Sequence, residues 1–551
     1  SGVKVDEDYK RYYPYGTLAS KVLGFTGADN QGILGLEVKY DEYLQGTNGK
    51  ILTLTDARGI EIENAGESRL EPVNGYDLCL SLDRNIQMYC EQAAKKVCTK
   101  KSADSVSVIV MNPQNGELMA MVNYPEFDLN DPFTLVGDTG ESVSAEEKQN
   151  LLNKMWRNQC ISDTYEPGST FKIVSTYAPA LNEKGMTLAT TFEDEPYEYP
   201  DGSPVNNATR SYNGTTTIRT AIQNSINVVA VKCFEEVTPD LGLKYLDNFG
   251  FTTLAHGTEA DTDANGNVWS DANLATALGG ITNGVTNVEL CASYAAIANG
   301  GNYIKPIYYT KILDHNGNVL IENTSAERSV IKESTAYLLT SAMEDVVKKG
   351  TGTACQLDNM AVAGKTGTTE AYNDLWFVGY TPYYTCAVWS GYDNNEKLPD
   401  YARNFHKNLW KKVMTRIHEG LPSKEFEKPA SVEKLSVCEE TGLLPRAGCP
   451  VITEYFDVGT MPTEYCDQHF YDESYDEYDY NYDNSDESSS QTDANTDDAN
   501  NDSDTNNNGD DSNGGEDNDG EDNGDGGDYD GDNGGDTNGG EDDSSYQIDY
   551  Y

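Results

Sequence analysis

The middle of this 551-residue sequence carries strand patterns at both of its ends and helical patterns between them. Two runs of aliphatic and β-branched residues, 106–111 and 117–122, flank a Pro/Asn-Gly turn and predict a β-hairpin. Further strand-like runs follow only much later, at 360–368, 375–380 and 384–392. A single antiparallel sheet that combines both ends, with helices flanking it, fits this order. We therefore predict an α+β domain over residues 101–420.

An amphipathic helix is predicted directly before the hairpin. Apolar residues from Ile86 to Val97 recur at intervals of three and four, which places them on one stripe of a helix. Asp83 stands where an N-cap residue is expected. Residues 1 to about 80 are rich in glycine, tyrosine and short β-like runs, and we predict a separate β-rich N-terminal domain over residues 1–100. Pro422 marks the end of the central domain.

Charge divides the sequence into a body and an acidic tail. Of the 92 Asp and Glu residues, 29 lie in residues 471–551, where Lys and Arg are absent. The rest of the chain holds 63 acidic against 39 basic residues, a net charge of −24, which argues against a nucleic-acid partner. The Asp/Asn/Gly-rich stretch 476–551 has too few apolar residues to offset the entropy of ordering, so we predict disorder. A calcium-binding repeat is the alternative, but the stretch lacks a fixed period.

A serine and a lysine three residues apart suggest nucleophilic chemistry. Pro167 and Gly168 fit a turn that opens a helix, with Ser169 in its first turn and Lys172 on the same face. A serine hydroxyl needs a base to become a good nucleophile, and burial makes a lysine lose its proton more readily. The competing interpretation is a surface lysine beside an ordinary N-terminal serine. Ser431 to Lys434 has the same spacing in a polar stretch that reads as a linker.

Two further motifs favour the chemical interpretation. Ser225-Ile226-Asn227 lies between two helix-like runs, and Lys365-Thr366-Gly367-Thr368 follows a strand-like run. The order Ser-x-x-Lys, Ser-x-Asn, Lys-Thr-Gly is typical of penicillin-binding proteins and serine β-lactamases. Over about residues 103–420 the chain resembles a penicillin-binding protein with a DD-transpeptidase domain. The implied fold is an antiparallel sheet flanked by helices, with an N-terminal pedestal.

This resemblance implies a role for each motif residue. Ser169 is expected to be the acylating nucleophile and Lys172 its base. Ser225 is expected to relay a proton to the leaving group, and Asn227 to hold the substrate amide. Lys365 is expected to supply positive charge beside Ser225.

The remaining motif residues are expected to bind the substrate. Thr366 and Thr368 would bind its carboxylate, and Gly367 would let the edge strand approach its backbone. The oxyanion hole would consist of the backbone N–H groups of Ser169 and Thr368. No metal and no cofactor are expected.

The implied activity is cross-linking of peptidoglycan stem peptides at D-Ala-D-Ala through an acyl-serine, which β-lactams would block. The expected partners are stem peptides, β-lactams and other cell-wall synthesis proteins. The alternatives are a carboxypeptidase or β-lactamase-type hydrolase, and a non-catalytic β-lactam sensor. The sequence contains no run of 18 apolar residues, so the implied location is extracytoplasmic, with association to the cell membrane through an N-terminal anchor absent from this chain.

The resemblance is composite. Segments typical of monofunctional class B proteins are Arg11–Ala19, Gly35–Glu37, Leu44–Gly46 and Ile161–Gly168. Segments typical of bifunctional class A proteins are Tyr177–Leu181, Gly279–Thr286, Asp374–Pro382 and Cys438–His469. Nothing in the sequence resembles a glycosyltransferase domain, so glycan polymerisation is not predicted.

The segment 421–475 holds three cysteines and a histidine that three interpretations fit. Cys438, Cys449, Cys466 and His469 have the residue types of a zinc site. Their spacings of ten and sixteen intervening residues match no familiar finger pattern. A Cys438–Cys449 disulfide and free structural thiols are the alternatives in an extracytoplasmic protein, and we predict no metal.

Overall fold

The computed structural model describes residues 10–52, 58, 68–101, 105–137, 143–369, 372–391 and 404–469. The acidic tail predicted at 476–551 lies outside these residues. Within the described ranges, no helix combines the length and the apolar composition needed to cross a lipid bilayer.

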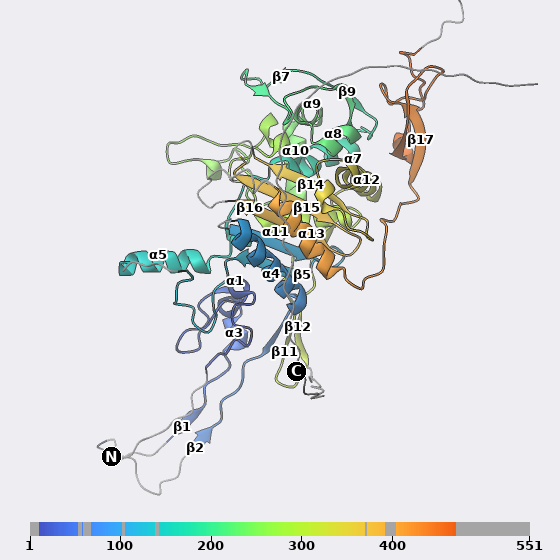
Figure 1. Ribbon diagram of the computed structural model, residues 1–551. Helices are drawn as coiled ribbons and strands as arrows, with labels where there is room; N and C mark the ends of the chain where they lie inside the picture. Colours follow the sequence, from blue (N-terminus) through green and yellow to red (C-terminus); the bar gives the residue numbers. More distant parts are fainter. Residues whose placement is uncertain are drawn as a thin grey trace, which may run out of the picture. The chain divides into compact units, whose positions relative to one another are not determined.

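A five-stranded antiparallel sheet forms the centre of the protein (Figure 1). Its order is β14-β15-β16-β4-β5. The strands are β4 (Ser105–Met111), β5 (Leu118–Tyr124), β14 (Ala363–Thr368), β15 (Asp374–Tyr380) and β16 (Thr385–Gly391). β16 pairs with β4, with Cys386 opposite Val110, and so joins the early hairpin to the late strands. The predicted union of both ends of the domain in one sheet is confirmed.

Helices cover both faces of this sheet because successive side chains of a strand point to opposite faces. Val106, Val108 and Val110 face a core that includes α4 (Arg84–Lys101) and α13 (Phe405–Ile417), and Figure 1 shows both helices against the sheet. Residues of the opposite face, such as Ile109 and Met111, pack in the larger core. Every residue of β4 is therefore buried.

The helix predicted before the hairpin is α4, and its cap is confirmed. The Asp83 carboxylate accepts hydrogen bonds from the backbone N–H groups of Asn85 and Ile86, at 2.8 and 2.9 Å. Because α4 covers the sheet, its apolar stripe packs in the core of the domain that follows, while Arg84 and Glu91 hydrogen-bond to Tyr15 and Ala19 of the segment before it. The division of the chain near residue 100 stays a prediction.

The segment between the strands is mainly helical, as predicted. Its α-helices are α5 (Ala145–Trp156), α6 (Gln159–Ser162), α7 (Ala178–Asn182), α8 (Ile218–Asn224), α9 (Asn227–Val237), α10 (Pro239–Asn248), α11 (Asn287–Ala298) and α12 (Glu333–Lys349). Its 3-10 turns are η1 (Gly168–Thr170), η3 (Glu259–Asp261), η4 (Leu274–Leu278) and η5 (Thr353–Cys355), and η2 (Ile173–Tyr177) is π-helical. Pro179 lies in the first turn of α7, directly after the π-helical turn, and α7 continues beyond it.

Short paired strands complete this segment. They are β6 (Thr191–Asp194) with β9 (Gly214–Thr217), β7 (Tyr197–Glu198) with β8 (Pro204–Val205), and β10 (Asn302–Ile304) with β13 (Glu327–Ser329).

The described N-terminal residues combine short helices and strands. They are α1 (Ser20–Leu23), α2 (Gly35–Lys39), α3 (Asp41–Leu44), β1 (Lys50–Leu52), β2 (Ser68–Leu70) and β3 (Asp77–Leu80). β1 pairs with β2. β3 pairs with β11 (Tyr309–Leu313), which in turn pairs with β12 (Val319–Glu322).

The C-terminal appendage is a β-hairpin, β17 (Val432–Cys438) and β18 (Val451–Asp457), followed by the turn η7 (Val458–Thr460). The second Ser-x-x-Lys match was expected in a linker, and this expectation is wrong: most of it lies in β17. The reason is that Val432 and Val437 are buried, the latter in a small core with Phe456 of β18.

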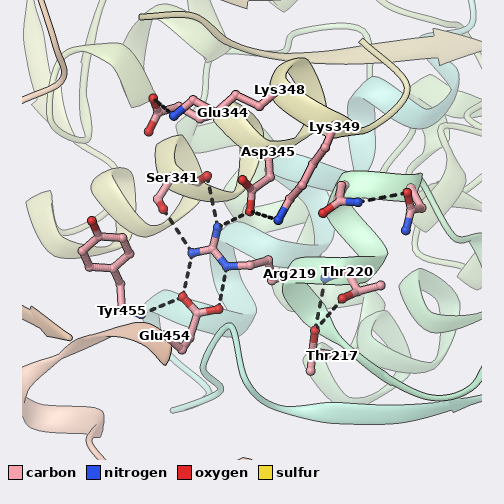
Figure 2. Close-up of polar contacts among 12 residues, drawn as sticks. Thr217, Arg219, Thr220, Ser341, Glu344, Asp345, Lys348, Lys349, Glu454 and Tyr455 are labelled. Atoms are coloured by element: carbon pink, nitrogen blue, oxygen red, sulfur yellow. Dashed lines mark hydrogen bonds and ion pairs between the residues drawn. The ribbon is translucent and has the colours of Figure 1, made fainter. Parts of the chain in front are cut away.

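One arginine connects the appendage to the helical segment (Figure 2). Arg219 of α8 donates two hydrogen bonds to the Glu454 carboxylate of β18, at 2.5 and 2.6 Å. The same guanidinium donates to Asp345 and to the backbone and side chain of Ser341, both in α12.

Candidate active site

The first motif lies where η1 opens a helix. Gly168 adopts φ +53°, a conformation that favours glycine, and a Cβ at this position would lie 3.0 Å from the Thr368 carbonyl oxygen. The turn that holds Ser169 therefore lies directly against the end of β14. Ser169 is half-buried, and its hydroxyl has no hydrogen-bond partner among the residues that the structure describes.

Lys172 is fully buried and directs its amine at the second motif. Its Nζ lies 2.6 Å from the side-chain oxygen of Asn227 and 2.8 Å from the backbone carbonyl of Ser225. The Ser225 hydroxyl and the Ile226 carbonyl follow at 3.4 and 3.3 Å. All four acceptors are neutral oxygens. The interpretation of Lys172 as a surface lysine is therefore wrong, because packing encloses the whole side chain.

Ser225 lies between the two lysines. It ends α8 in the left-handed conformation at φ 59°, which is uncommon for a serine and is typical of sites under functional constraint. The Lys365 amine donates to its hydroxyl at 2.8 Å and to the Thr366 carbonyl at 3.0 Å. The Ser225 hydroxyl thus contacts the amines of both Lys172 and Lys365.

The environment of both lysines disfavours a positive charge. Burial, and then the charge of Lys365, hold the pKa of Lys172 well below its ordinary value. Burial lowers the pKa of Lys365 to about 7. Within the described residues neither amine has a carboxylate partner. An amine that is neutral near physiological pH can accept a proton, and a hydroxyl between two such amines can pass one on.

The third motif lies on the edge strand of the sheet. β14 is the edge strand, and it carries Lys365 to Thr368. A Cβ at Gly367 would lie 2.7 Å from the Pro167 carbonyl oxygen, so the glycine allows β14 to pack against η1. The Thr366 and Thr351 hydroxyl groups lie 2.8 Å apart, and Thr368 is exposed. An exposed edge offers unpaired backbone groups to an extended peptide.

Sequence reasoning missed residues that position these motifs. The Asn207 side-chain oxygen accepts hydrogen bonds from the backbone N–H groups of Asn227 and Val228, and so caps α9. The Asn227 amide donates to the backbone carbonyl of Asn206 at 2.6 Å. Thr351 also positions a motif residue, because its hydroxyl contacts that of Thr366. No local sequence pattern marks Asn206, Asn207 or Thr351. The residue that each one contacts lies about twenty positions away for the two asparagines and about fifteen for the threonine.

Protein-family models match the chain in three places. The penicillin binding protein transpeptidase domain matches residues 106–415. The penicillin-binding protein dimerisation domain matches residues 1–80, and the penicillin-binding protein 1A C-terminal domain matches residues 428–471. The dimerisation-domain match agrees with the class B-like segments, and the 1A C-terminal-domain match agrees with the class A-like segments. The composite resemblance is therefore confirmed.

Relatives with known names agree with these matches. Stage V sporulation protein D of Bacillus subtilis is 32% identical over 398 residues, which are 69% of this chain and 59% of that protein. Penicillin-binding protein 1A of Clostridium botulinum is 32% identical over 381 residues, which are 66% of this chain and 42% of that protein. The chain thus spans about half the length of these relatives.

Solved structures show the same fold. The D,D-transpeptidase domain of a peptidoglycan glycosyltransferase from Eggerthella lenta superposes with a TM-score of 0.56 at 24% identity, over 75% of this chain and 93% of that one. Penicillin binding protein 3 from Mycobacterium tuberculosis, complexed with aztreonam, gives 0.59 at 22% identity, over 75% and 91%. Because the transpeptidase model alone matches more than half of the sequence, the chain belongs to the penicillin-binding protein transpeptidase family.

Proposed function

We propose that this protein is a peptidoglycan DD-transpeptidase that works through an acyl-enzyme on Ser169. The observation that carries the proposal is the convergence of two buried amines on the Ser225 hydroxyl, beside the turn that holds Ser169. Two adjacent unpaired cations in a protein interior are costly, and such an arrangement is typical of a site whose general base is a neutral amine.

In the first half-reaction, the neutral amine of Lys172 takes the proton of the Ser169 hydroxyl. The serine oxygen attacks the carbonyl carbon of the D-Ala-D-Ala bond and forms a tetrahedral oxyanion. The backbone N–H groups of Ser169 and Thr368 are proposed to stabilise this oxyanion. The close contact between Gly168 and the Thr368 backbone supports this pairing, since a Cβ on Gly168 would lie 3.2 Å from the Thr368 nitrogen.

Collapse of the intermediate breaks the peptide bond and releases D-Ala, whose nitrogen needs a proton. Ser225 is proposed to deliver it, because its hydroxyl contacts Lys172 at 3.4 Å and Lys365 at 2.8 Å. In the second half-reaction, an amine of a neighbouring stem peptide attacks the acyl-serine and loses its proton to the same groups. The product is a cross-link, and Ser169 is regenerated.

Substrate binding is proposed along the edge strand β14. The donor peptide would extend the sheet, with Asn227 holding its amide and Thr366 and Thr368 holding its terminal carboxylate. The positive charge of Lys365 favours an anion at this position. A β-lactam would acylate Ser169 in the same way. Peptidoglycan lies outside the cytoplasmic membrane, so we propose that the protein acts there, with other cell-wall synthesis proteins as partners.

The experiment is covalent labelling with penicillin, followed by mass spectrometry of the digested protein and an assay of cross-linking. We expect a stable adduct on Ser169 and cross-linked stem peptides. Ser169→Ala should abolish the adduct, whereas Ser431→Ala is the matched control, since Ser431 begins the other Ser-x-x-Lys match and is exposed.

Other outcomes separate the alternatives. Rapid hydrolysis of the adduct would indicate a hydrolase, and a stable adduct without turnover would indicate a sensor. An adduct that persists in Ser169→Ala would contradict the assignment of the nucleophile. Absence of any adduct would contradict all three functions.

A further inference from the structure

The four Cys and His residues of the appendage converge on one point. One ligand atom from each of Cys438, Cys449, Cys466 and His469 lies within 4.8 Å of all the others. The Nδ1 atom of His469 lies 3.2 Å from the Cys466 sulfur and 3.6 Å from the Cys438 sulfur. The three cysteines are free thiols in the structure.

We propose that Cys438, Cys449, Cys466 and His469 bind one structural zinc ion. With Zn–S of about 2.3 Å and Zn–N of about 2.0 Å, a tetrahedral site separates its sulfur and nitrogen ligands by about 3.6 Å and its sulfurs by about 3.8 Å. The two Nδ1–sulfur distances, 3.2 and 3.6 Å, lie close to the expected separation, and all four ligand atoms lie within 4.8 Å of one another. Three sulfurs and one imidazole select zinc among the common metals, and four protein ligands leave no open position for catalysis.

The surroundings of the cluster have the contacts that support metal ligands. The other ring nitrogen of His469, Nε2, lies 3.3 Å from the Glu440 carboxylate, which would fix the tautomer that offers Nδ1 to a metal. The backbone N–H of Arg446 donates to the Cys449 sulfur at 3.2 Å. Hydrogen bonds of this kind stabilise a thiolate. The two contacts come from residues outside the set of four.

The fold of the appendage explains why a metal would be useful there. Cys438 ends β17 and Cys449 lies just before β18, so two ligands lie at the end of the hairpin where residues 439–450 connect its strands. Cys466 and His469 follow η7 and would connect the last described residues to that end. The core beneath the hairpin is small: Val437 and Phe456 of the hairpin pack with Ala189 of the helical segment. Two-stranded hairpins are marginally stable alone, and small units of this kind commonly use a metal or a disulfide.

A disulfide explains the cluster less completely. A Cys438–Cys449 bond would leave Cys466 as a lone thiol beside His469, and it would give the imidazole no role. Zinc uses all four groups. Binding would replace the protons of three thiols with the metal, so up to three protons are released and no oxidant is required.

The test is the zinc content of the full chain, purified without a polyhistidine tag, chelator or reductant. We expect about one zinc per chain by plasma mass spectrometry, and little zinc in Cys466→Ser or His469→Ala. Cys79→Ser is the matched control, because Cys79 is half-buried in β3, outside the cluster, and it should keep the metal. Glu440→Gln should weaken zinc affinity about 10-fold or more in competition with a chelator.

Two measurements keep the proposal falsifiable even if a variant folds poorly. Cobalt added to the metal-depleted wild-type chain should give the charge-transfer band of thiolate ligation. The intact mass of the denatured chain should show all thiols reduced. A zinc-free chain lighter by two hydrogens, with Cys438 and Cys449 linked in one digest fragment, would overturn the proposal. Iron in place of zinc, or no metal with free thiols, would overturn it as well.

Discussion

The candidate active site and the contact between α8 and the appendage both enclose basic side chains, and they treat the charge in opposite ways. At the candidate active site, Lys172 and Lys365 are fully buried beside neutral oxygens. At the contact between α8 and the appendage, Arg219 is surrounded by the carboxylates of Glu454 and Asp345 (Figure 2). The two places lie at opposite ends of α8, since Ser225 is its C-cap residue.

The difference in partners distinguishes basic side chains enclosed for catalysis from one enclosed for stability. A guanidinium stays charged, and its planar donors match two carboxylates, so pairing makes its burial tolerable. An amine can lose its proton, and burial without a carboxylate partner lowers its pKa and so favours the neutral form. We infer that a basic side chain paired with carboxylates stabilises the fold, as Arg219 does. A buried basic side chain without a carboxylate partner, such as Lys172, instead serves catalysis. Four variants test this contrast.

The largest effect is expected for Lys172→Met. Removing the proposed base should slow acylation by penicillin by about 10²–10⁴-fold, the usual contribution of general base catalysis. Stability should change much less than activity, because a side chain of similar length replaces a buried amine whose partners are neutral. The measurement is the acylation rate by mass spectrometry, alongside denaturant unfolding. A rate within tenfold of wild type would show that another group is the base.

Arg219→Met should have the reverse profile. It leaves Glu454, whose side chain is only 2% exposed, as a buried charge without its partner. The free energy of unfolding should fall by about 3–5 kcal/mol, while the acylation rate of the folded protein stays close to wild type.

The control for this variant is the double substitution Arg219→Met and Glu454→Met. Replacing both partners with apolar side chains should recover most of the lost stability, because the uncompensated carboxylate is gone. A double variant as unstable as the single one would show that packing, and not charge pairing, makes the contact important.

Lys365→Gln is expected to move the pH profile of acylation. The positive charge of Lys365 is the second cause, after burial, that lowers the pKa of Lys172. Removing this charge raises the pKa of Lys172, and acylation needs the neutral amine, which is present above that pKa. The rise of the residual acylation rate should therefore move to higher pH. Lys349→Gln, an exposed lysine, is the control. A profile that stays in place, or moves to lower pH, would contradict the coupling of the two amines.

The sequence could predict the parts of the fold that depend on local pattern. Strand-like runs rich in aliphatic, β-branched and aromatic residues marked the five strands, and the spacing of apolar residues and an N-cap marked α4. The short hydrophobic alternation from Val432 to Val437 was missed, because polar neighbours hide a strand that buries only one face. Pairing of β16 with β4 could be expected only from the order of the elements.

The candidate site divides in the same way. Three motifs located Ser169, Lys172, Ser225, Asn227 and Lys365, because the residue types themselves carry the chemistry. Asn207 and Thr351 were missed, because only the folded chain brings them to Asn227 and Thr366. The prediction of no metal at the Cys and His cluster has the same origin: spacing along the chain did not reveal that four ligand atoms lie within 4.8 Å of one another.

The smallest effect is expected for Lys349→Ala, which belongs to the same charge network as Arg219 (Figure 2). Its amine lies 3.5 Å from the Asp345 carboxylate, but its side chain is 59% exposed. Water already solvates such an amine, and Asp345 keeps Arg219 as a partner, so unfolding should become easier by no more than about 0.5 kcal/mol. Denaturant unfolding of Lys349→Ala and Arg219→Met in parallel measures the loss of stability in each variant. A decrease of more than about 1 kcal/mol in the free energy of unfolding would show that an exposed ion pair stabilises this protein substantially. That result would contradict the proposed difference between buried and exposed charge pairs.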